Sequence, residues 1–472
     1  MVFADLFFVF LFFPLCLLVY FFVSSMKAKN IVLIVFSLIF YAWGSPIWIL
    51  LLLFSAVFNW YMGLKVHWFR NRNMGKAAAA LAILVNIGLL TAFHFTDSLA
   101  STINSLFGPS LPASGKIFPI GIGFFTLQAI SYIVDCYQNQ VRPQRHFYLF
   151  LLYVSLFPKA AAGPNILYHE IAGELTDRRS DPTDIYDGIV RFSVGLAKKV
   201  LLADHLWAIV QSFWGTDISR LSTCGTWYTL LVYALCIYFD FSGYSDMAIG
   251  IGRIFGFHFP ENFDHPFLCR SITGFWQRWH ISLGSFFRNC LSGDRVPEKW
   301  RNGPMILPVC LCMGLWHGAS WNYLICGLYF GLFLLLEKML GEDRLKKWPV
   351  WAAHIYSKLV ILIGFGIFYF KSFQQLGCFF TNLSGAGIFT NGNAFADVMV
   401  WNSLKSSILL ILTSLLFCAP VRAKITGRFL HRGTPVFQRT KVIQMICCII
   451  LLIICTILLT GKTGIPLLYW QY

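Results

Sequence analysis

Long apolar runs without a charged side chain recur along this chain and constrain its fold more than any other feature. Three examples are Phe7–Val23, Ile31–Leu50 (broken only by a Gly-Ser-Pro turn) and Val442–Thr460. As helices, these runs are each roughly long enough to cross a hydrocarbon core about 30 Å thick. We therefore expect an all-α polytopic membrane protein with about ten to twelve transmembrane helices.

Composition supports this class. The 472-residue chain is 57% hydrophobic and only 12% charged, with 17% aromatic residues; a typical soluble domain has about 25% charged residues. The first apolar run is not followed by a soluble remainder, so we interpret it as a retained anchor and not as a signal peptide. We expect one membrane domain over residues 1–472, with N-terminal helices (1–145), a core with re-entrant elements (146–340) and C-terminal helices (341–472).

The net charge of +16 comes from short basic clusters between apolar runs, and not from one basic face. Such clusters mark cytoplasmic loops and contact anionic lipid, so we expect a membrane partner and no nucleic acid. The clusters fit an N-terminus on the outer side. They are Lys27/Lys29, Lys65–Lys76, Arg142/Arg145, Lys338–Lys347 and Arg422–Lys441.

The 14 cysteines lie mostly in predicted spans, where a thiol behaves as a small apolar group. The chain has no C-x-x-C pair and no Cys/His spacing suited to zinc, so we expect no metal site and no bound cofactor.

Three segments interrupt the apolar helices. Phe157–Tyr168 (FPKAAAGPNILY) holds two prolines and a glycine, which predicts a broken or re-entrant element. Gly252–Trp300 is too polar to span and too aromatic for a solvated loop. We expect short amphipathic helices there, at the interface or folded into a cavity. Phe373–Trp401 is predicted as an outer loop with a short helix.

His317 is the residue with the strongest claim to chemistry. It is the one ionisable group among the 32 residues from Met305 to Leu336, apart from Tyr and Cys, and these residues would make a helix of about 48 Å. We expect a break at Gly314–Asn322 with His317 deep within it, where an ionisable group is costly and marks function. The alternative is a neutral histidine that donates one hydrogen bond between packed helices.

Acids and serines gather in Tyr238–Asp246 at the expected end of an apolar segment, where Gly243 permits an irregular backbone. Asp240, Ser242 and Asp246 would line a polar site that orients a base. The alternative is a set of helix caps.

Phe275–Ser282 (FWQRWHIS) combines cations, indoles and an imidazole: Trp276, Arg278, Trp279 and His280. These side chains could bind an anionic molecule by pairing and stacking, with His280 as an acid or base. The alternative is an interfacial Trp/Arg belt.

Together, YFDFSGYSDMAIGIGRIFGFHFPENFDHPF, SITGFWQRWHISLGSFFR and GLWHGASWN, in this order, resemble the membrane-bound O-acyltransferase family, in its bacterial polysaccharide O-acetyltransferase branch. The resemblance extends to the N-terminal MVFADLFFVFLFFP, the FP…AGP element and the terminal IPLLYWQY. The segment FFRNCLSGDRVPEKWRNG lacks the family's usual Tyr-Pro-Leu-Gly-Gly run, and Gln277 replaces its usual Arg.

The resemblance implies a ring of helices around a catalytic channel, with the family's two histidines at His317 and His280. It implies that His317 is the general base of an acyl transfer, and His280, Trp279 or the Gly318 amide a donor to the oxyanion. Trp276, Arg278, Trp279, Asp240, Ser242, Asp246, Trp316 and Asn322 are the substrate- or donor-binding residues that we expect.

The implied donor is a cytoplasmic acyl thioester, acetyl-CoA or an acyl carrier protein. The implied acceptor is a polysaccharide, reached directly or through an extracytoplasmic esterase-fold partner, and the location is the bacterial inner membrane. Two alternatives stay open. One is D-alanyl transfer to teichoic acid. The other is a transporter, which would require charge pairs in several spans and an inverted repeat.

Overall fold

The computed structural model describes residues 1–44, 46–94, 108, 121–160, 163–291, 303–420 and 435–461. Within them the chain is helical, and the one strand-like pairing is an isolated antiparallel bridge between Phe263 and Trp279. The all-α prediction is confirmed. Most of the segment after Arg288, most of the cluster Arg422–Lys441 and the terminal IPLLYWQY lie outside the described residues.

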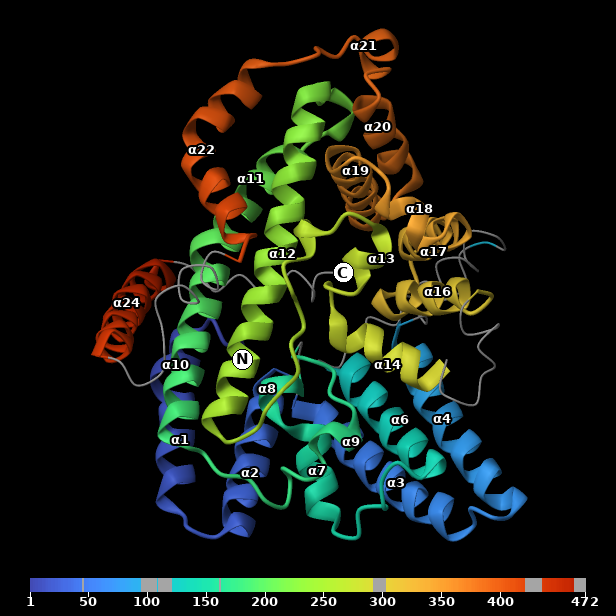
Figure 1. Cartoon of the computed structure of the whole chain (residues 1–472), viewed down its shortest axis with the longest axis vertical. Coiled ribbons are helices and arrows are strands. Elements are labelled where there is room, and N and C mark those ends of the chain that lie inside the picture. The colour runs from blue at the N-terminus through green and yellow to red at the C-terminus, as the bar shows by residue number, and fades with distance from the viewer. Residues whose placement is uncertain are drawn as a thin grey trace. The chain divides into compact units, whose positions relative to one another are not determined.

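The α-helices are, in chain order (Figure 1), α1 Phe13–Phe22, α2 Met26–Gly44, α3 Ile49–Trp68, α4 Asn73–His94, α6 Ile122–Gln138, α7 Phe147–Ser155, α8 Phe157–Ala160, α9 Tyr168–Ile171, α10 Pro182–Ala197, α11 Asp204–Trp214, α12 Thr223–Ile254, α13 Ile272–Trp276, α14 Ile281–Leu291, α16 Ile306–His317, α17 Trp321–Leu340, α18 Glu342–Lys346, α19 Val350–Tyr369, α20 Phe373–Leu383, α21 Gly387–Thr390, α22 Val398–Phe417 and α24 Pro435–Thr460. In the part of the chain that the structure describes, two π-helical segments, Phe8–Phe12 and Lys198–Ala203, and three short 3₁₀ segments, Pro46–Trp48, Ile218–Arg220 and Pro266–Leu268, accompany them.

Eight of the described helices are long and apolar enough to cross a membrane, and two shorter apolar helices, Phe8–Phe22 and Ile306–His317, accompany them. The eight are Met26–Gly44, Pro46–Trp68, Asn73–Phe93, Thr223–Ile254, Trp321–Leu340, Val350–Tyr369, Val398–Phe417 and Arg439–Thr460. The chain is therefore a multi-pass membrane protein. The full count of ten to twelve spans and the ring arrangement stay predictions.

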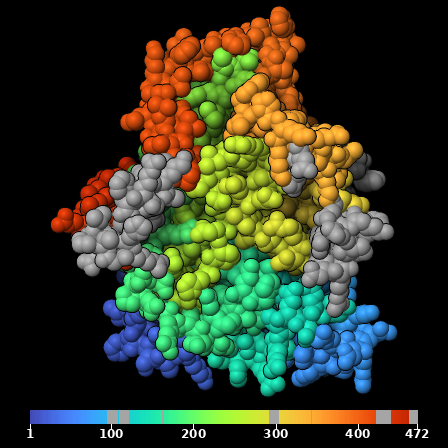
Figure 2. All heavy atoms as spheres, in the orientation of Figure 1, coloured from blue at the N-terminus to red at the C-terminus, as the bar shows by residue number. Residues whose placement is uncertain are grey.

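The outer faces of these helices are apolar. Leu50 of α3, Leu84 of α4 and Leu409 of α22 are 72%, 65% and 75% exposed. Figure 2 displays α3 and α4 in blue and α22 in orange at the surface. Apolar exposure on this scale would be costly in water but is the expected outer surface of a helix in lipid.

The chain divides into two compact units. Unit 1 comprises Met1–Phe192, Tyr244–Glu261 and Ser285–Cys290, and unit 2 comprises Ser193–Gly243, Asn262–Gly284 and Leu291–Tyr472. The single domain expected from the sequence stays a prediction.

In unit 1, helices α3, α4 and α6 pack against one another (Figure 1). Two amides join α3 to α4: Asn59 Nδ2 donates to Asn86 Oδ1 at 3.2 Å, and Asn86 Nδ2 donates to Asn59 Oδ1 at 2.6 Å. Reciprocal bonding satisfies two polar groups that would otherwise be costly among apolar helices.

The expected break in Phe157–Tyr168 is confirmed. Helix α7 ends at Ser155, α8 runs for four residues, and the chain is not helical between Gly163 and Leu167. Lys159 of α8 is buried; its Nζ donates to Gln128 Oε1 at 2.9 Å and lies 3.7 Å from the centre of the Tyr153 ring. The re-entrant depth of this element stays a prediction.

The expected helix end at Tyr238–Asp246 is wrong. Helix α12 continues for 32 residues through this stretch, so the acids and serines are not caps. A Cβ at Gly243 would lie 2.8 Å from the carbonyl oxygen of Gly195. Gly243 therefore permits close helix packing, and not an irregular backbone.

The break at His317 is confirmed. Helix α16 ends at His317 and α17 begins at Trp321. Gly318, between them, has φ +148°, a backbone region that only glycine adopts readily. The two helices pack closely, because a Cβ at Gly314 would lie 2.3 Å from the carbonyl oxygen of Tyr323. A pair of helices in contact thus replaces one overlong helix.

The semi-polar region Gly252–Trp300 contains short helices, as predicted: the 3₁₀ segment Pro266–Leu268, then α13 and α14. Phe373–Trp401 also contains short helices, α20 and α21, before α22 begins.

Candidate active site

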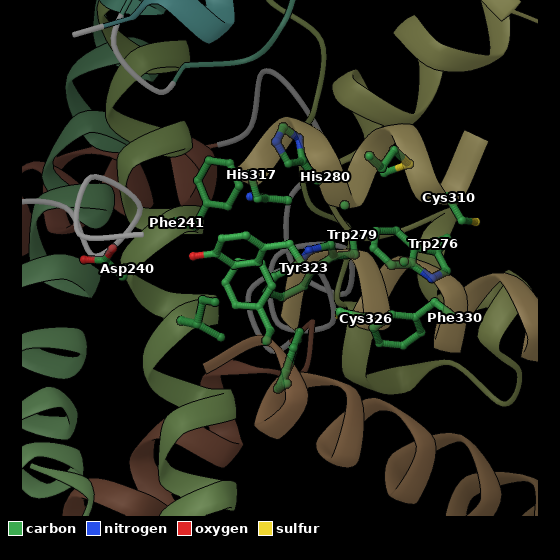
Figure 3. Close-up of a pocket in the computed structure, with 16 residues that line it drawn as sticks. Asp240, Phe241, Trp276, Trp279, His280, Cys310, His317, Tyr323, Cys326 and Phe330 are labelled. Carbon is green, nitrogen blue, oxygen red and sulfur yellow. The ribbon is translucent and has the colours of Figure 1, made fainter. Parts of the chain in front are cut away.

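A cavity in unit 2 brings together the histidines that the sequence singles out. Its volume is about 850 Å³, including the part open to solvent. Figure 3 displays the residues that line it. They are Ile237, Asp240, Phe241, Trp276, Trp279, His280, Cys310, Met313, Gly314, His317, Tyr323, Cys326, Gly327, Phe330, Phe365 and Phe368.

His317 is the last residue of α16, so it lies at the negative end of the helix dipole. Such a position stabilises a protonated imidazole by about 0.3–1 kcal/mol. Aromatic rings surround the side chain: Phe368 meets it edge-on at 5.0 Å between ring centres, and Tyr323 lies at 6.0 Å. The ring is therefore held among apolar neighbours at the negative end of α16.

A backbone pairing places His280 in the cavity. The Asp264 amide donates to the Arg278 carbonyl, and the Ile281 amide donates to the Asn262 carbonyl, each at 3.0 Å. These bonds hold His280 between them at φ +47°, an uncommon conformation for a residue other than glycine. Its ring meets Phe241 edge-on at 4.7 Å. The backbone conformation of His280 costs energy, and it is maintained at the residue whose imidazole points into the cavity.

Asn262 fixes the tautomer of His280. Asn262 Oδ1 accepts hydrogen bonds from the Ser282 amide at 3.3 Å and from Ser282 Oγ at 2.9 Å. A backbone amide can only donate, so the oxygen of the Asn262 side chain must face it. The same oxygen lies 3.1 Å from His280 Nδ1, which must therefore carry the proton. The lone pair of the neutral ring is then on Nε2.

His280 is 2% exposed, and its Nε2 has no hydrogen-bond partner among the described residues. Burial, together with the neighbouring His317, holds the pKa of His280 well below its usual range. His280 is therefore neutral near pH 7, and Nε2 is a vacant hydrogen-bond acceptor.

Two further polar groups of the cavity are buried and lack a partner among the described residues: the Trp276 indole nitrogen and the Tyr323 hydroxyl. Buried polar groups in native proteins are nearly always hydrogen-bonded. An apolar cavity that keeps two donors and one acceptor unsatisfied is suited to a ligand with complementary polar atoms.

Asp240, on the cavity wall, belongs to a buried charge cluster. Lys199 Nζ lies 2.6 Å from Asp240 Oδ1 and 2.9 Å from Asp204 Oδ1, and all three residues are at most 5% exposed. Burial alone would lower the pKa of Lys199, but the two carboxylates raise it above its usual value. Asp240 is therefore an ion-pair partner of the charged Lys199.

Glu337 of α17 positions the helix that precedes His280. It is buried, and its carboxylate accepts hydrogen bonds from the Ile272 amide at 2.6 Å and the Thr273 amide at 2.8 Å. These amides open α13 and have no partner within the helix, so Glu337 caps it.

Of the ten predicted site residues, five line the cavity: Asp240, Trp276, Trp279, His280 and His317. Trp316 is buried next to it, with its ring 6.0 Å from that of His280. The cavity wall does not include the other four, Arg278, Asn322, Ser242 and Asp246.

Three of these four residues are ion-paired or hydrogen-bonded to another residue. Arg278 pairs with Asp264 at 3.1 Å, Asp246 of unit 1 pairs with Arg191 at 2.8 Å, and Asn322 Nδ2 donates to the Phe368 carbonyl at 2.6 Å. Ser242 is buried in α12. Among the described residues, no three His, Cys, Asp or Glu side chains are grouped as metal ligands would be.

Reasoning from sequence misses Asn262, Tyr323, Lys199 and Glu337. Asn262 lies inside the quoted motif PENFDHPF, and Glu337 directly follows the uncharged stretch that contains His317. Both positions are visible signals. Lys199 and Tyr323 carry no sequence pattern that separates them from other lysines and tyrosines of the chain.

The sequence profile of the membrane-bound O-acyltransferase family (MBOAT) matches residues 124–374. The chain is 34% identical over 379 residues to the probable alginate O-acetylase of Azotobacter vinelandii, covering 78% of this chain and 75% of that protein. It is 34% identical over 369 residues to the peptidoglycan O-acetyltransferase of Helicobacter pylori, covering 70% and 69%. It is 26% identical over 289 residues to the teichoic acid D-alanyltransferase of Bacillus subtilis, covering 57% and 72%.

The matched segment contains every described residue of the cavity wall, from Ile237 to Phe368. The alginate and peptidoglycan relatives extend the similarity over more than two thirds of both chains. The chain therefore belongs to the membrane-bound O-acyltransferase family and is an O-acyltransferase.

Proposed function

We propose that the protein transfers an acetyl group from an acyl thioester to hydroxyl groups of an extracytoplasmic polysaccharide. The observation that carries the proposal is the pair of imidazoles, His317 and His280, in one apolar cavity. Relatives named as alginate and peptidoglycan O-acetylating enzymes support acetyl as the group and a glycan as the acceptor. The proposed location is the inner membrane of a bacterium, with the donor on the cytoplasmic side.

In the proposed reaction, the acceptor hydroxyl oxygen attacks the carbonyl carbon of the thioester while His317 removes the hydroxyl proton. A C–O bond forms, the carbonyl π electrons move to oxygen, and the C–S bond then breaks as the carbonyl re-forms. The imidazolium of His317 returns its proton to the departing thiolate. The position of His317 at a helix C-terminus favours this transient charge.

His280 takes a different part. In the tautomer that Asn262 sets, Nε2 accepts a hydrogen bond and cannot donate one. His280 therefore suits a hydroxyl of the acceptor better than a developing oxyanion, which needs donors. This assignment replaces the oxyanion role expected from the family resemblance.

The cavity wall limits how the donor binds. Its described residues include no Lys or Arg, so the phosphates of coenzyme A would remain outside and only the thioester end would enter. Arg278 is ion-paired with Asp264 outside the wall, but it stays a candidate for an outer contact with the donor. An acyl carrier protein would present the same thioester through its phosphopantetheine arm.

The test is the identity of the ester-linked group. Cells that express the protein should carry a polysaccharide from which mild alkali releases acetate, and cells that lack it should not. Release of D-alanine instead would favour the teichoic acid reaction, for which the 26% identical relative is the argument. Release of neither from any cell-envelope glycan would contradict the proposal that the acceptor is a polysaccharide.

We expect Asn262→Asp to move the acid limit of activity to higher pH. Burial keeps His280 neutral, so in the wild type its protonation should limit the rate only in acid. A carboxylate beside Nδ1 stabilises the imidazolium and raises the pKa, by about one unit or more. The other titratable groups on the cavity wall, His317, Asp240, Tyr323, Cys310 and Cys326, are unchanged in the variant.

The measurement is the pH dependence of acetyl transfer by membranes that hold equal amounts of each protein. The acid limb should shift upward in Asn262→Asp, and Asn262→Leu should lower the rate at every pH because the ring is no longer held. Superimposable profiles for wild type and Asn262→Asp would contradict the assigned role of His280.

A further inference from the structure

Acyl transfer requires a hydrogen-bond donor at the carbonyl oxygen, where negative charge develops. We propose that the hydroxyl of Tyr323 is this donor and that Tyr323 is a further catalytic residue. The inference rests on the proposed function, because it assumes that a thioester carbonyl enters the cavity beside His317.

The cavity offers few candidates for this task. Of the two other donors expected from the resemblance, the Gly318 amide donates to the Leu315 carbonyl, and the Trp279 ring packs against Phe275 and Phe365. His280 cannot donate from Nε2, because Asn262 holds its proton on Nδ1. The buried side-chain donors on the wall that lack a partner, among the described residues, are Trp276 Nε1 and the Tyr323 hydroxyl.

Position separates these two candidates. The oxyanion is the oxygen of the carbonyl group that the acceptor hydroxyl attacks. In the proposed reaction that hydroxyl is bound to His317, so the donor must be close to His317. The ring of Tyr323 lies 6.0 Å from that of His317, and both contact Phe368. Trp276 instead packs against Phe275 and Phe330. Figure 3 displays Tyr323 in the same cavity as the two histidines.

The Tyr323 side chain is held rigidly. It is 2% exposed and lies in the first turn of α17, directly after the helix break. A Cβ at Gly318 would lie 3.1 Å from Tyr323 Cε2, so the ring packs on the backbone of the break. Its ring also contacts Phe368 at 4.9 Å between centres. A donor that is already in place needs no reorganisation when charge develops.

The unsatisfied hydroxyl is the second part of the case. Phenylalanine would fill the same space without leaving a buried donor unpaired, and a donor without a partner costs stability. A tyrosine at position 323 therefore costs stability when its hydroxyl has no partner. The presence of tyrosine there is explained if a ligand oxygen accepts this hydrogen bond. Tyr323 keeps its proton throughout. Its O–H donates a hydrogen bond to the oxyanion, and this hydrogen bond is released when the C–S bond breaks and the carbonyl re-forms.

Tyr329 provides a matched control on the same helix. Its hydroxyl donates to the Val360 carbonyl at 3.1 Å, and it is not on the cavity wall. Tyr323→Phe removes a hydroxyl without a partner, whereas Tyr329→Phe removes one that is bonded. We therefore expect Tyr323→Phe to lose activity without losing stability, and Tyr329→Phe to lose stability without losing activity.

The experiment measures both quantities on wild type, Tyr323→Phe and Tyr329→Phe. Activity is the transfer of label from acetyl-labelled coenzyme A to an alginate or peptidoglycan oligosaccharide by membrane vesicles, and stability is the melting temperature of the purified protein. We expect Tyr323→Phe to lower kcat about 100-fold or more, with little change in KM and an equal or higher melting temperature. Tyr329→Phe should melt at a lower temperature and keep its kcat.

Each outcome bears on a different claim. Transfer by Tyr323→Phe within twofold of wild type would overturn the role of Tyr323 and leave the proposed function standing. A raised KM with unchanged kcat would also overturn it, because it would indicate substrate binding without stabilisation of the transition state. Absence of transfer by the wild type to both oligosaccharides would overturn the proposed function and, with it, this inference.

Discussion

Replacing His317 with alanine or glutamine is expected to lower acetylation of the acceptor by about 100- to 10,000-fold, the usual contribution of a general base. The side chain lines the cavity at the end of α16, and the chain turns sharply at Gly318 to present it there. His280 cannot simply take over, since it is held elsewhere on the wall by Asn262.

The ester content of the polysaccharide, measured in cells with equal protein levels, tests this expectation. His265→Gln is the matched control, because His265 is a half-buried imidazole of unit 2 that bonds the Cys418 carbonyl and is not on the cavity wall. Loss of esters in the His317 variants with retention in the control is the expected pattern. Equal loss in both would mean that acetylation depends on folding and not on His317.

Lys199→Met is expected to destabilise the protein by about 3–5 kcal/mol, the usual cost of removing one partner from a buried ion pair. Lys199 lies between Asp204 and Asp240, and all three side chains are at most 6% exposed. Without the ammonium, two carboxylates remain close together in a poorly solvated interior. The change should appear as a lower melting temperature and as loss of monodisperse protein in detergent.

Two companion variants make the result specific. Lys198→Met removes the same charge at the adjacent, half-buried position and should have a much smaller effect. The triple variant Lys199→Met, Asp204→Asn, Asp240→Asn removes the whole cluster. It should recover much of the loss, because neutral replacement of a buried ion cluster is often tolerated. A Lys199→Met protein that melts like the wild type would show that the cluster is not a stabilising element.

The sequence anticipates the features that local chemistry determines. A uniform apolar composition predicts the spanning helices, and the small residues within Gly314–Asn322 predict the break at His317. His280 also stands out, because imidazole beside two indoles in a semi-polar region is unusual. These predictions depend on residue type and spacing alone, so no knowledge of tertiary contacts is needed.

Features that depend on long-range contacts are not predictable in this way. Lys199 meets Asp240 from 41 positions away, and the π-helical turn at Lys198–Ala203 alters the side-chain register of its helix. The acids at Tyr238–Asp246 look like caps, yet α12 runs through them, and Gly243 serves the close approach of Gly195. Arg278 resembles a ligand-binding residue, but backbone pairing with Asp264 provides it with a partner.

The most direct test of the account is a single measurement on purified protein in lipid nanodiscs: the rate of thiol release from acetyl-CoA that depends on an acceptor oligosaccharide, for wild type and His317→Gln. Equal amounts of folded protein are compared, as judged by melting temperature. The account predicts release matched by ester formation in the wild type and a rate at least about 100-fold lower in the variant. Equal rates in the two proteins would contradict it.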